Sequence, residues 1–132
     1  EWYITASEPY IPGGITYLPL TFEPPLRENE SLTAELDTSP TKEDLVQCYL
    51  QKEPARKLIN LQNLPILILS AEASYHAPYD HGTSNFLKQA GVEHDFIRLE
   101  DNKIHGNGHM MMLEKNNHQI ADFLLEWMQS KI

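Results

Sequence analysis

The chain has 132 residues, a length typical of one domain, and 41% of them are hydrophobic, which favours a globular class over a disordered one. Ten basic residues against nineteen acidic ones give a formal net charge of -9, which disfavours nucleic acid as a partner. No apolar run is long enough to span a membrane. The single cysteine, Cys48, excludes a disulfide within the chain. The sequence therefore leaves the localisation open.

Residues 1–40 carry most of the prolines and show neither a helical nor a strand period. Proline fixes its own φ and pushes the preceding residue toward extended backbone, so this segment is expected to form no long helix. Long segments without internal structure are uncommon in compact domains. We therefore expect 1–40 to be an irregular proline-rich arm, a cap or loop region that lies over other structure.

From Thr41 the sequence becomes more regular. Residues 41–51 place apolar side chains at helical spacing behind a threonine and two acidic residues, which predicts a helix to about Gln51. Pro54 opens the segment 54–59, which predicts a second, short helix with proline in its first turn.

A strand, a helix and a second strand are predicted next. Residues 64–70 are a continuous apolar run, typical of a strand covered on both faces by helices. The helix that follows is expected to have Asp80 as its N-cap and Gly91 as its left-handed stop. Residues 94–99 predict the second strand.

An apolar stripe at helical spacing predicts a final amphipathic helix that ends near Gln129, with Ile120, Phe123, Leu124 and Trp127 on its buried face. The order from residue 64 onward is therefore that of a parallel α/β crossover with a closing helix. A parallel pair alone leaves two unpaired edges. We therefore expect it to dock on a larger sheet, supplied by another chain or by an N-terminal region.

Polar side chains crowd the loops that follow the two strands, at 71–79 and 100–109. In open α/β sheets, ligands bind beyond the carboxyl ends of the strands. Four of the six histidines lie in or beside these loops, namely His76, His81, His105 and His109. Gly106 and Gly108 flank Asn107 and would let the backbone turn sharply.

The order of these elements resembles the C-terminal end of α/β-hydrolases, where the catalytic histidine follows the last strand. The stretch 105–117, His-Gly-Asn-Gly-His-Met-Met-Met-Leu-Glu-Lys-Asn-Asn, is similar to a signature of a group of bacterial and fungal esterase-like members, and 15–25 and 71–80 support the likeness. The resemblance implies an α/β fold class, in which 41–132 is the C-terminal βαβα part of a single α/β-hydrolase domain completed by a missing N-terminal region or partner chain.

The resemblance assigns His109 as the base of a catalytic triad, and an imidazole titrating near neutrality suits that role. Asn107, His105, His76 and Glu72 are implied as residues that line the pocket or support the base.

The nucleophile is expected elsewhere. No Gly-x-Ser-x-Gly elbow occurs in the sequence, and Ser84 sits within a predicted helix. An N-terminal chain or region is therefore expected to carry the nucleophilic serine and the oxyanion hole. The resemblance implies a small-molecule ester as the substrate, and no cofactor is predicted. The triad acid is expected in the same upstream part, with Glu72 as the second choice and Asp80 also eligible.

Other interpretations of the histidine loop remain open. The chain could be a non-catalytic interaction module in which the loop only packs. The spacing of His105 and His109 resembles that of a pair of metal ligands, so the chain could instead be a zinc-binding protein. A glycine-rich loop, however, lacks the helical geometry that places residues i and i+4 on one face. Residues 110–112, three methionines, are expected to pack beneath the loop.

Overall fold

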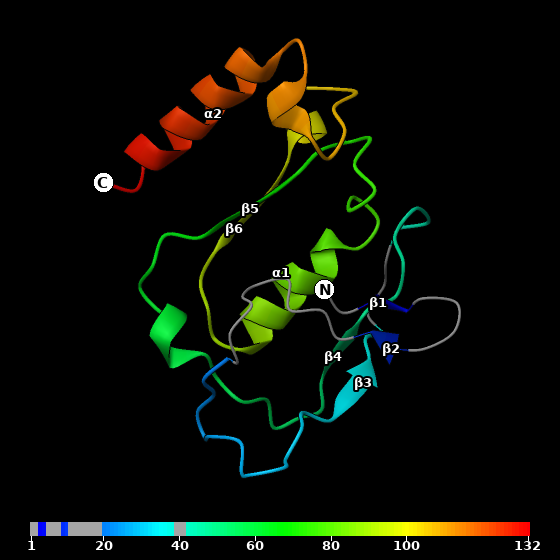
Figure 1. The fold of residues 1–132 in the computed structure, drawn as a ribbon, viewed down its shortest axis with the longest axis vertical. Coiled ribbons are helices and arrows are strands. Elements are labelled where there is room, and N and C mark those ends of the chain that lie inside the picture. The colour runs from blue at the N-terminus through cyan, green and yellow to red at the C-terminus, as the bar shows by residue number, and fades with distance from the viewer. Residues whose placement is uncertain (1–2, 5–8, 11–19, 39–41) are drawn as a thin grey trace.

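The computed structural model describes residues 3–4, 9–10, 20–38 and 42–132. Within them lie six strands, β1 (Tyr3–Ile4), β2 (Pro9–Tyr10), β3 (Ala34–Leu36), β4 (Tyr49–Gln51), β5 (Leu67–Ser70) and β6 (Asp95–Arg98), and two α-helices, α1 (Asp80–Gln89) and α2 (Asn117–Gln129) (Figure 1). The same residues also form short 3-10 helices, η1 (Ile59–Leu61), η2 (Leu99–Asn102) and η3 (Met111–Leu113). Within this part of the chain, no helix is long and apolar enough to cross a bilayer.

The strands of the described residues pair two by two. β1 with β2 and β3 with β4 are antiparallel, whereas β5 and β6 are parallel, with Leu67 opposite Asp95 and Ser70 opposite Arg98. The predicted strands at 64–70 and 94–99 are therefore confirmed as shorter elements, joined through α1 as expected.

The two α-helices lie on opposite sides of the β5–β6 pair (Figure 1). Successive side chains of a strand point to opposite faces. Ile68 packs in a cluster with Phe86 of α1, whereas Leu69 packs in a second cluster with Ile120 of α2. Each helix thus covers one face of the pair, as the unbroken apolar run predicted.

Gly91 ends α1 as predicted. Its φ is +74°, and its N–H donates to the carbonyl of Lys88 while Val92 N–H donates to Leu87. These two bonds are those of a Schellman motif, which requires the left-handed conformation that glycine adopts without strain.

The prediction that Asp80 caps α1 is wrong. Asp80 is the first residue inside the helix, Tyr79 precedes it, and no side chain caps the first turn. The Asp80 carboxylate instead accepts a hydrogen bond from His76, at 3.2 Å between Oδ1 and Nδ1. A contact with the side chain four residues earlier has therefore replaced the capping bond.

The predicted helix over 41–51 is also wrong, and Thr41 itself lies outside the described residues. The end of this segment is β4, which pairs with β3. The side chain of Gln89 bonds both backbone groups of Gln51, with Gln51 N–H donating to Oε1 at 2.9 Å and Nε2 donating to the carbonyl at 2.7 Å. This long-range pairing outweighs a short helical pattern.

The predicted helix over 54–59 does not form either. Lys57 makes an isolated antiparallel bridge to Glu23, and η1 begins only at Ile59. Two backbone bonds of 2.8 Å join Lys57 and Glu23. The bridge to Glu23 requires an extended backbone at Lys57, and this conformation excludes a helix over 54–59.

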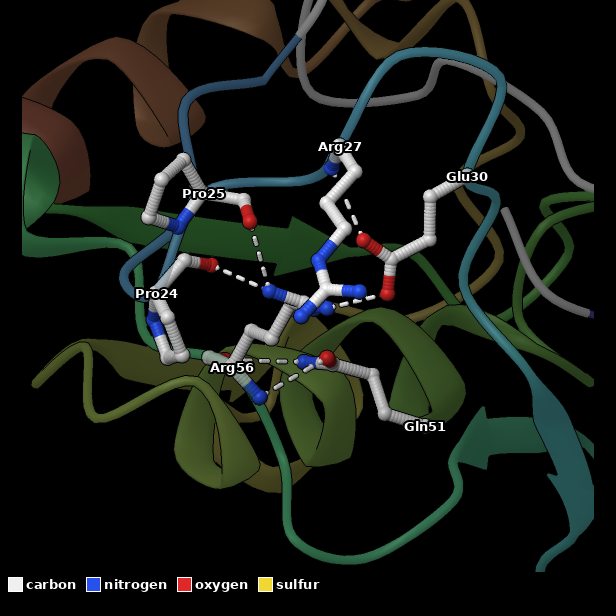
Figure 2. Close-up of polar contacts among 6 residues, drawn as sticks. All are labelled: Pro24, Pro25, Arg27, Glu30, Gln51 and Arg56. Atoms are coloured by element: carbon white, nitrogen blue, oxygen red, sulfur yellow. Dashed lines mark hydrogen bonds and ion pairs between the residues drawn. The ribbon is translucent and has the colours of Figure 1, made fainter.

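The described part of the arm packs onto α1. Phe22 is 6% exposed and lies in one cluster with Leu58 and Phe86. Arg56 holds the following loop, because its Nη1 donates to the carbonyls of Pro24 and Pro25 at 2.6 and 2.8 Å (Figure 2). Residues 20–38 thus pack against α1 and contribute β3 to a sheet.

Glu30 completes this attachment. Its carboxylate pairs with the guanidinium of Arg56 and also accepts from the backbone N–H of Arg27 at 2.8 Å (Figure 2). The Arg27 N–H first, and then Arg56, lower the pKa of Glu30 below its ordinary value.

The apolar residues near α2 are less buried than predicted. Met110 and Met112 are 55% and 57% exposed, and only Met111 packs against the second cluster. The methionine prediction is therefore correct for Met111 alone.

Trp127 is half-buried and donates its Nε1–H to Asp95 Oδ2 at 2.6 Å, which ties α2 to the start of β6.

Candidate active site

The loops that follow β5 and β6 meet at the carboxyl end of the parallel pair, as the sequence predicted. The N–H of Ala73 donates to the carbonyl of Asn107 at 2.9 Å and joins the two loops directly. Polar side chains from loops of different strands therefore share one small region.

His109 lies where these loops meet. Its Nδ1 is 3.3 Å from the hydroxyl oxygen of Ser74. The ring of His76 stacks on it, with centroids 4.3 Å apart and planes inclined by 13°, and Tyr75 lies 4.6 Å away. The imidazole is thus held in its plane by ring contacts and along one edge by a hydrogen bond.

Ser74 is the buried member of this group, with 6% of its surface exposed. Its Oγ also accepts the backbone N–H of His76 at 3.1 Å, so the hydroxyl has a fixed position. A neutral hydroxyl orients an imidazole but supplies no charge to balance the imidazolium form. Ser74 could not be singled out among the polar residues of its loop from the sequence, because its importance depends on the contact with His109.

His76 is fixed from its other side by Asp80. Since a carboxylate accepts only, Nδ1 of His76 carries the hydrogen in their 3.2 Å contact. The two side chains are 17% and 13% exposed. His76 is therefore held by Asp80 while its ring stacks on that of His109.

Glu72 does not reach His109. Its Oε2 accepts the N–H of Gly106 at 2.8 Å and lies 3.3 Å from Nδ1 of His105. The Gly106 N–H first, and then His105, lower the pKa of the Glu72 carboxyl. Glu72 thus orders the turn at Gly106, where φ is +78°, and the His105–Glu72 pair stands apart from the His109 ring.

Asn107 is 1% exposed and its side chain is fully paired. Nδ2 donates to Glu114 and to Asn116, both at 2.7 Å, while Oδ1 accepts from Asn116 at 2.9 Å. Glu114 also accepts the N–H of Gly108 at 2.7 Å. The position of Asn107 in the polar loop predicts a place near the site, whereas its two partners could not be singled out from the sequence.

A curated relative is named "Probable secreted lipase phiG", from Fungal sp. (strain ATCC 74256), and is 46% identical to this chain over 123 residues. The matched segment covers 91% of this chain. This chain is related to a lipase-named protein. It spans only about a third of that relative's length, since the match covers 33% of it. No family model and no solved structure matches the sequence.

The lipase-like relationship raises the question of whether another serine meets a histidine, and Ser84 does. Its Oγ is 2.8 Å from Nε2 of His94, whose Nδ1 donates to the carbonyl of Val92 at 3.0 Å. Because that carbonyl only accepts, Nε2 is the acceptor of the Ser84 hydroxyl. Ser84 is 1% exposed and lies inside α1, so no substrate reaches it.

Cys48 also contacts a histidine, with its Sγ 3.7 Å from Nε2 of His81. Burial, with Asp37 nearby, raises the pKa of the thiol to about 11. Burial, and secondly the charge of Arg98, lowers the pKa of His81. Both groups are therefore neutral near pH 7, which is opposite to the activation of a nucleophilic cysteine.

Neither a metal cluster nor the large cavity involves His109. The described residues contain no group of three His, Cys, Asp or Glu side chains that could hold a metal ion. A cavity of about 850 Å³ lies at the amino ends of β5 and β6, among residues that include Ile66, Asp95 and Lys131. It is at the opposite end of the strands from the histidine loop.

Proposed function

We propose that this chain is the C-terminal part of an α/β-hydrolase-type serine esterase and contributes the catalytic base, His109. The relationship to a lipase-named protein supports a hydrolase, and the parallel β5–β6 pair with a helix on each face supports the fold. The observation that carries the proposal is the contact of His109 Nδ1 with buried Ser74, because it engages Nδ1 and leaves the opposite ring nitrogen, Nε2, to accept the proton of a nucleophile.

The protons of this arrangement are consistent with a base at Nε2. A neutral imidazole accepts a proton at Nε2 only when Nδ1 carries the hydrogen, so Ser74 Oγ must accept from Nδ1. That oxygen already accepts from His76 N–H. A hydroxyl oxygen has two lone pairs, so it satisfies both donors and keeps its own hydrogen for a third group.

The reaction follows the usual two steps of acyl transfer. His109 removes the proton of the attacking serine as the acyl-enzyme forms and returns it to the leaving alcohol, and it then activates water in the same way. Donors of an oxyanion hole stabilise the negative charge of each tetrahedral intermediate. The substrate class that suits a lipase-like relative is a carboxylic ester.

The nucleophile and the oxyanion hole would come from polypeptide outside these 132 residues. The sequence contains no Gly-x-Ser-x-Gly, Ser84 is buried, and Ser74 meets the nitrogen that does not accept the nucleophile's proton. The relative has about two thirds of its length outside the matched segment, which is ample for these parts. The acid would lie there too, since Glu72 is engaged by Gly106.

Replacing His109 tests this function. In the native protein, with any polypeptide that accompanies this chain, His109→Ala should lower kcat for a p-nitrophenyl ester by about 10³- to 10⁶-fold, because the general base is lost. His118→Ala, an exposed histidine of α2, is the matched control and should leave kcat within about twofold. Retention of a tenth or more of the turnover by His109→Ala would contradict the proposal.

A further inference from the structure

We infer that Glu114 is a positioning residue for His109, acting through the backbone of Gly108 and the side chain of Asn107; the inference rests on the proposed role of His109. Glu114 follows η3, yet its carboxylate reaches back to the residue that precedes His109. The Oε1 atom accepts Gly108 N–H at 2.7 Å and Oε2 accepts Asn107 Nδ2 at 2.7 Å. The carboxylate therefore closes the loop that carries the histidine.

These bonds are of the strong kind. A carboxylate that accepts from amide donors forms charge-assisted hydrogen bonds, which are shorter and stronger than neutral ones. Glu114 is half-buried and Asn107 is 1% exposed, so solvent competes little for the Asn107 bonds. Two adjacent residues of the loop, 107 and 108, are consequently held by one side chain.

The loop is also anchored at two other points. Asn116, directly before α2, pairs with the Asn107 amide in both directions, and the Asn107 carbonyl accepts from Ala73 N–H. Ala73 is the neighbour of Ser74, which contacts the His109 ring. The backbone on the N-terminal side of His109 and the partner of its ring are thus fixed in one connected network.

Glycine at position 108 suits this close approach. A Cβ built there would lie 3.3 Å from Glu114 Oε1, tighter than an ordinary contact. Glu114 does not act as the triad acid, because its oxygens face Gly108 and Asn107 while Nδ1 of His109 faces Ser74. Its contribution is therefore the placement of the loop.

The test measures two quantities when a fluorophosphonate labels the native protein. These are the first-order rate constant of labelling and the end point, which is the fraction of protein that is finally labelled. A misplacement of about 1 Å costs about 10²-fold in rate. Glu114→Gln puts an amide donor against the Asn107 amide or gives up the Gly108 bond, and should lower the rate constant about 10- to 100-fold. A merely structural role would lower the end point and leave the rate constant of the folded fraction unchanged.

Three further variants make the outcome unambiguous. Glu126→Gln, at an exposed position of α2, is the matched control and should keep the wild-type rate constant. If Glu114→Gln does not fold, Gly108→Ala tests the same contact. A rate constant within twofold of wild type in the folded variant overturns the inference. An unchanged constant in His109→Ala would overturn the proposed function instead.

Discussion

The hydroxyl of Ser74 and the imidazole of His109 meet at 3.3 Å, although the two residues are 35 positions apart in the chain. Ser74 comes from the loop after β5 and His109 from the loop after β6. Their contact makes Ser74, and not Glu72, the neighbour of the proposed base. Because Ser74 takes the single hydrogen of Nδ1, an acid supplied by other polypeptide would act through the hydroxyl hydrogen of Ser74 in the proposed function.

Ser74→Ala should slow ester hydrolysis in the native protein. It removes one hydrogen bond to His109 and the acceptor of His76 N–H, and one such bond is worth about 1 kcal/mol, or about fivefold in rate. Ser130→Ala, on an exposed hydroxyl at the end of α2, is the control. An unchanged kcat in Ser74→Ala would show that the contact does not orient the ring.

Asp95 should stabilise the fold in a pH-dependent manner. Its Oδ2 accepts from Trp127 Nε1 and pairs with Lys131, both at 2.6 Å, and the Lys131 bond first, then that of Trp127, lowers its pKa from 3.8. This stabilisation is fully present above the unfolded-state pKa of 3.8 and is lost as the pH falls through the lower folded-state value.

Asp95→Asn should therefore unfold more easily than wild type in urea at neutral pH, by about 1 kcal/mol or less because 38% of the side chain is exposed and solvent screens the pair. The difference should shrink below pH 3.8. Asp122→Asn, on an exposed face of α2, is the matched control. A destabilisation that stays constant across this range would contradict an ionic origin.

Arg56 should be a stability determinant of the arm. Arg56→Ala removes bonds to two carbonyls and an ion pair with Glu30, and should lower the free energy of unfolding by about 1 to 3 kcal/mol. Arg56→Lys should keep only part of this stabilisation, since the lysine ammonium lacks the planar guanidinium with its several N–H donors. The exposed Lys52–Glu35 pair is the contrast, and Lys52→Ala should cost less than about 0.5 kcal/mol. Equal losses in both alanine variants would refute this role.

Cys48 should resist alkylation in the folded protein. It is 1% exposed and its pKa of about 11 keeps it a thiol at pH 8. Iodoacetamide should therefore react at least about 100-fold more slowly with the native protein than with the same protein in denaturant. Mass spectrometry of the modified peptide measures both rates. Equal rates would mean that the pocket around Cys48 opens readily.

The sequence allowed prediction of the elements whose signals are local. The apolar run before Ser70, the Gly91 stop and the stripe from Ile120 each reflect a neighbouring residue or a helical period. The region 41–59 could not be predicted in this way. Its conformation depends on β3, on Glu23 and on the side chain of Gln89, which lie far away in the sequence.

The candidate site divides in the same manner. The two polar loops and their histidines follow from their position after parallel strands. By contrast, the partners of His109 and Asn107 depend on how the loops fold, so the contacts of Ser74 and Glu114 could not be predicted although both residues lie in the stretches that carry the resemblance. The spacing of Asp80 after a polar loop predicted a cap, whereas the structure uses its carboxylate to hold His76.

The most direct test is to map where a fluorophosphonate adduct forms in the native protein and in His109→Ala. We predict an adduct on a serine outside these 132 residues, lost in His109→Ala and kept in Ser84→Ala. An adduct on Ser74 or Ser84, or labelling that survives the loss of His109, would contradict it.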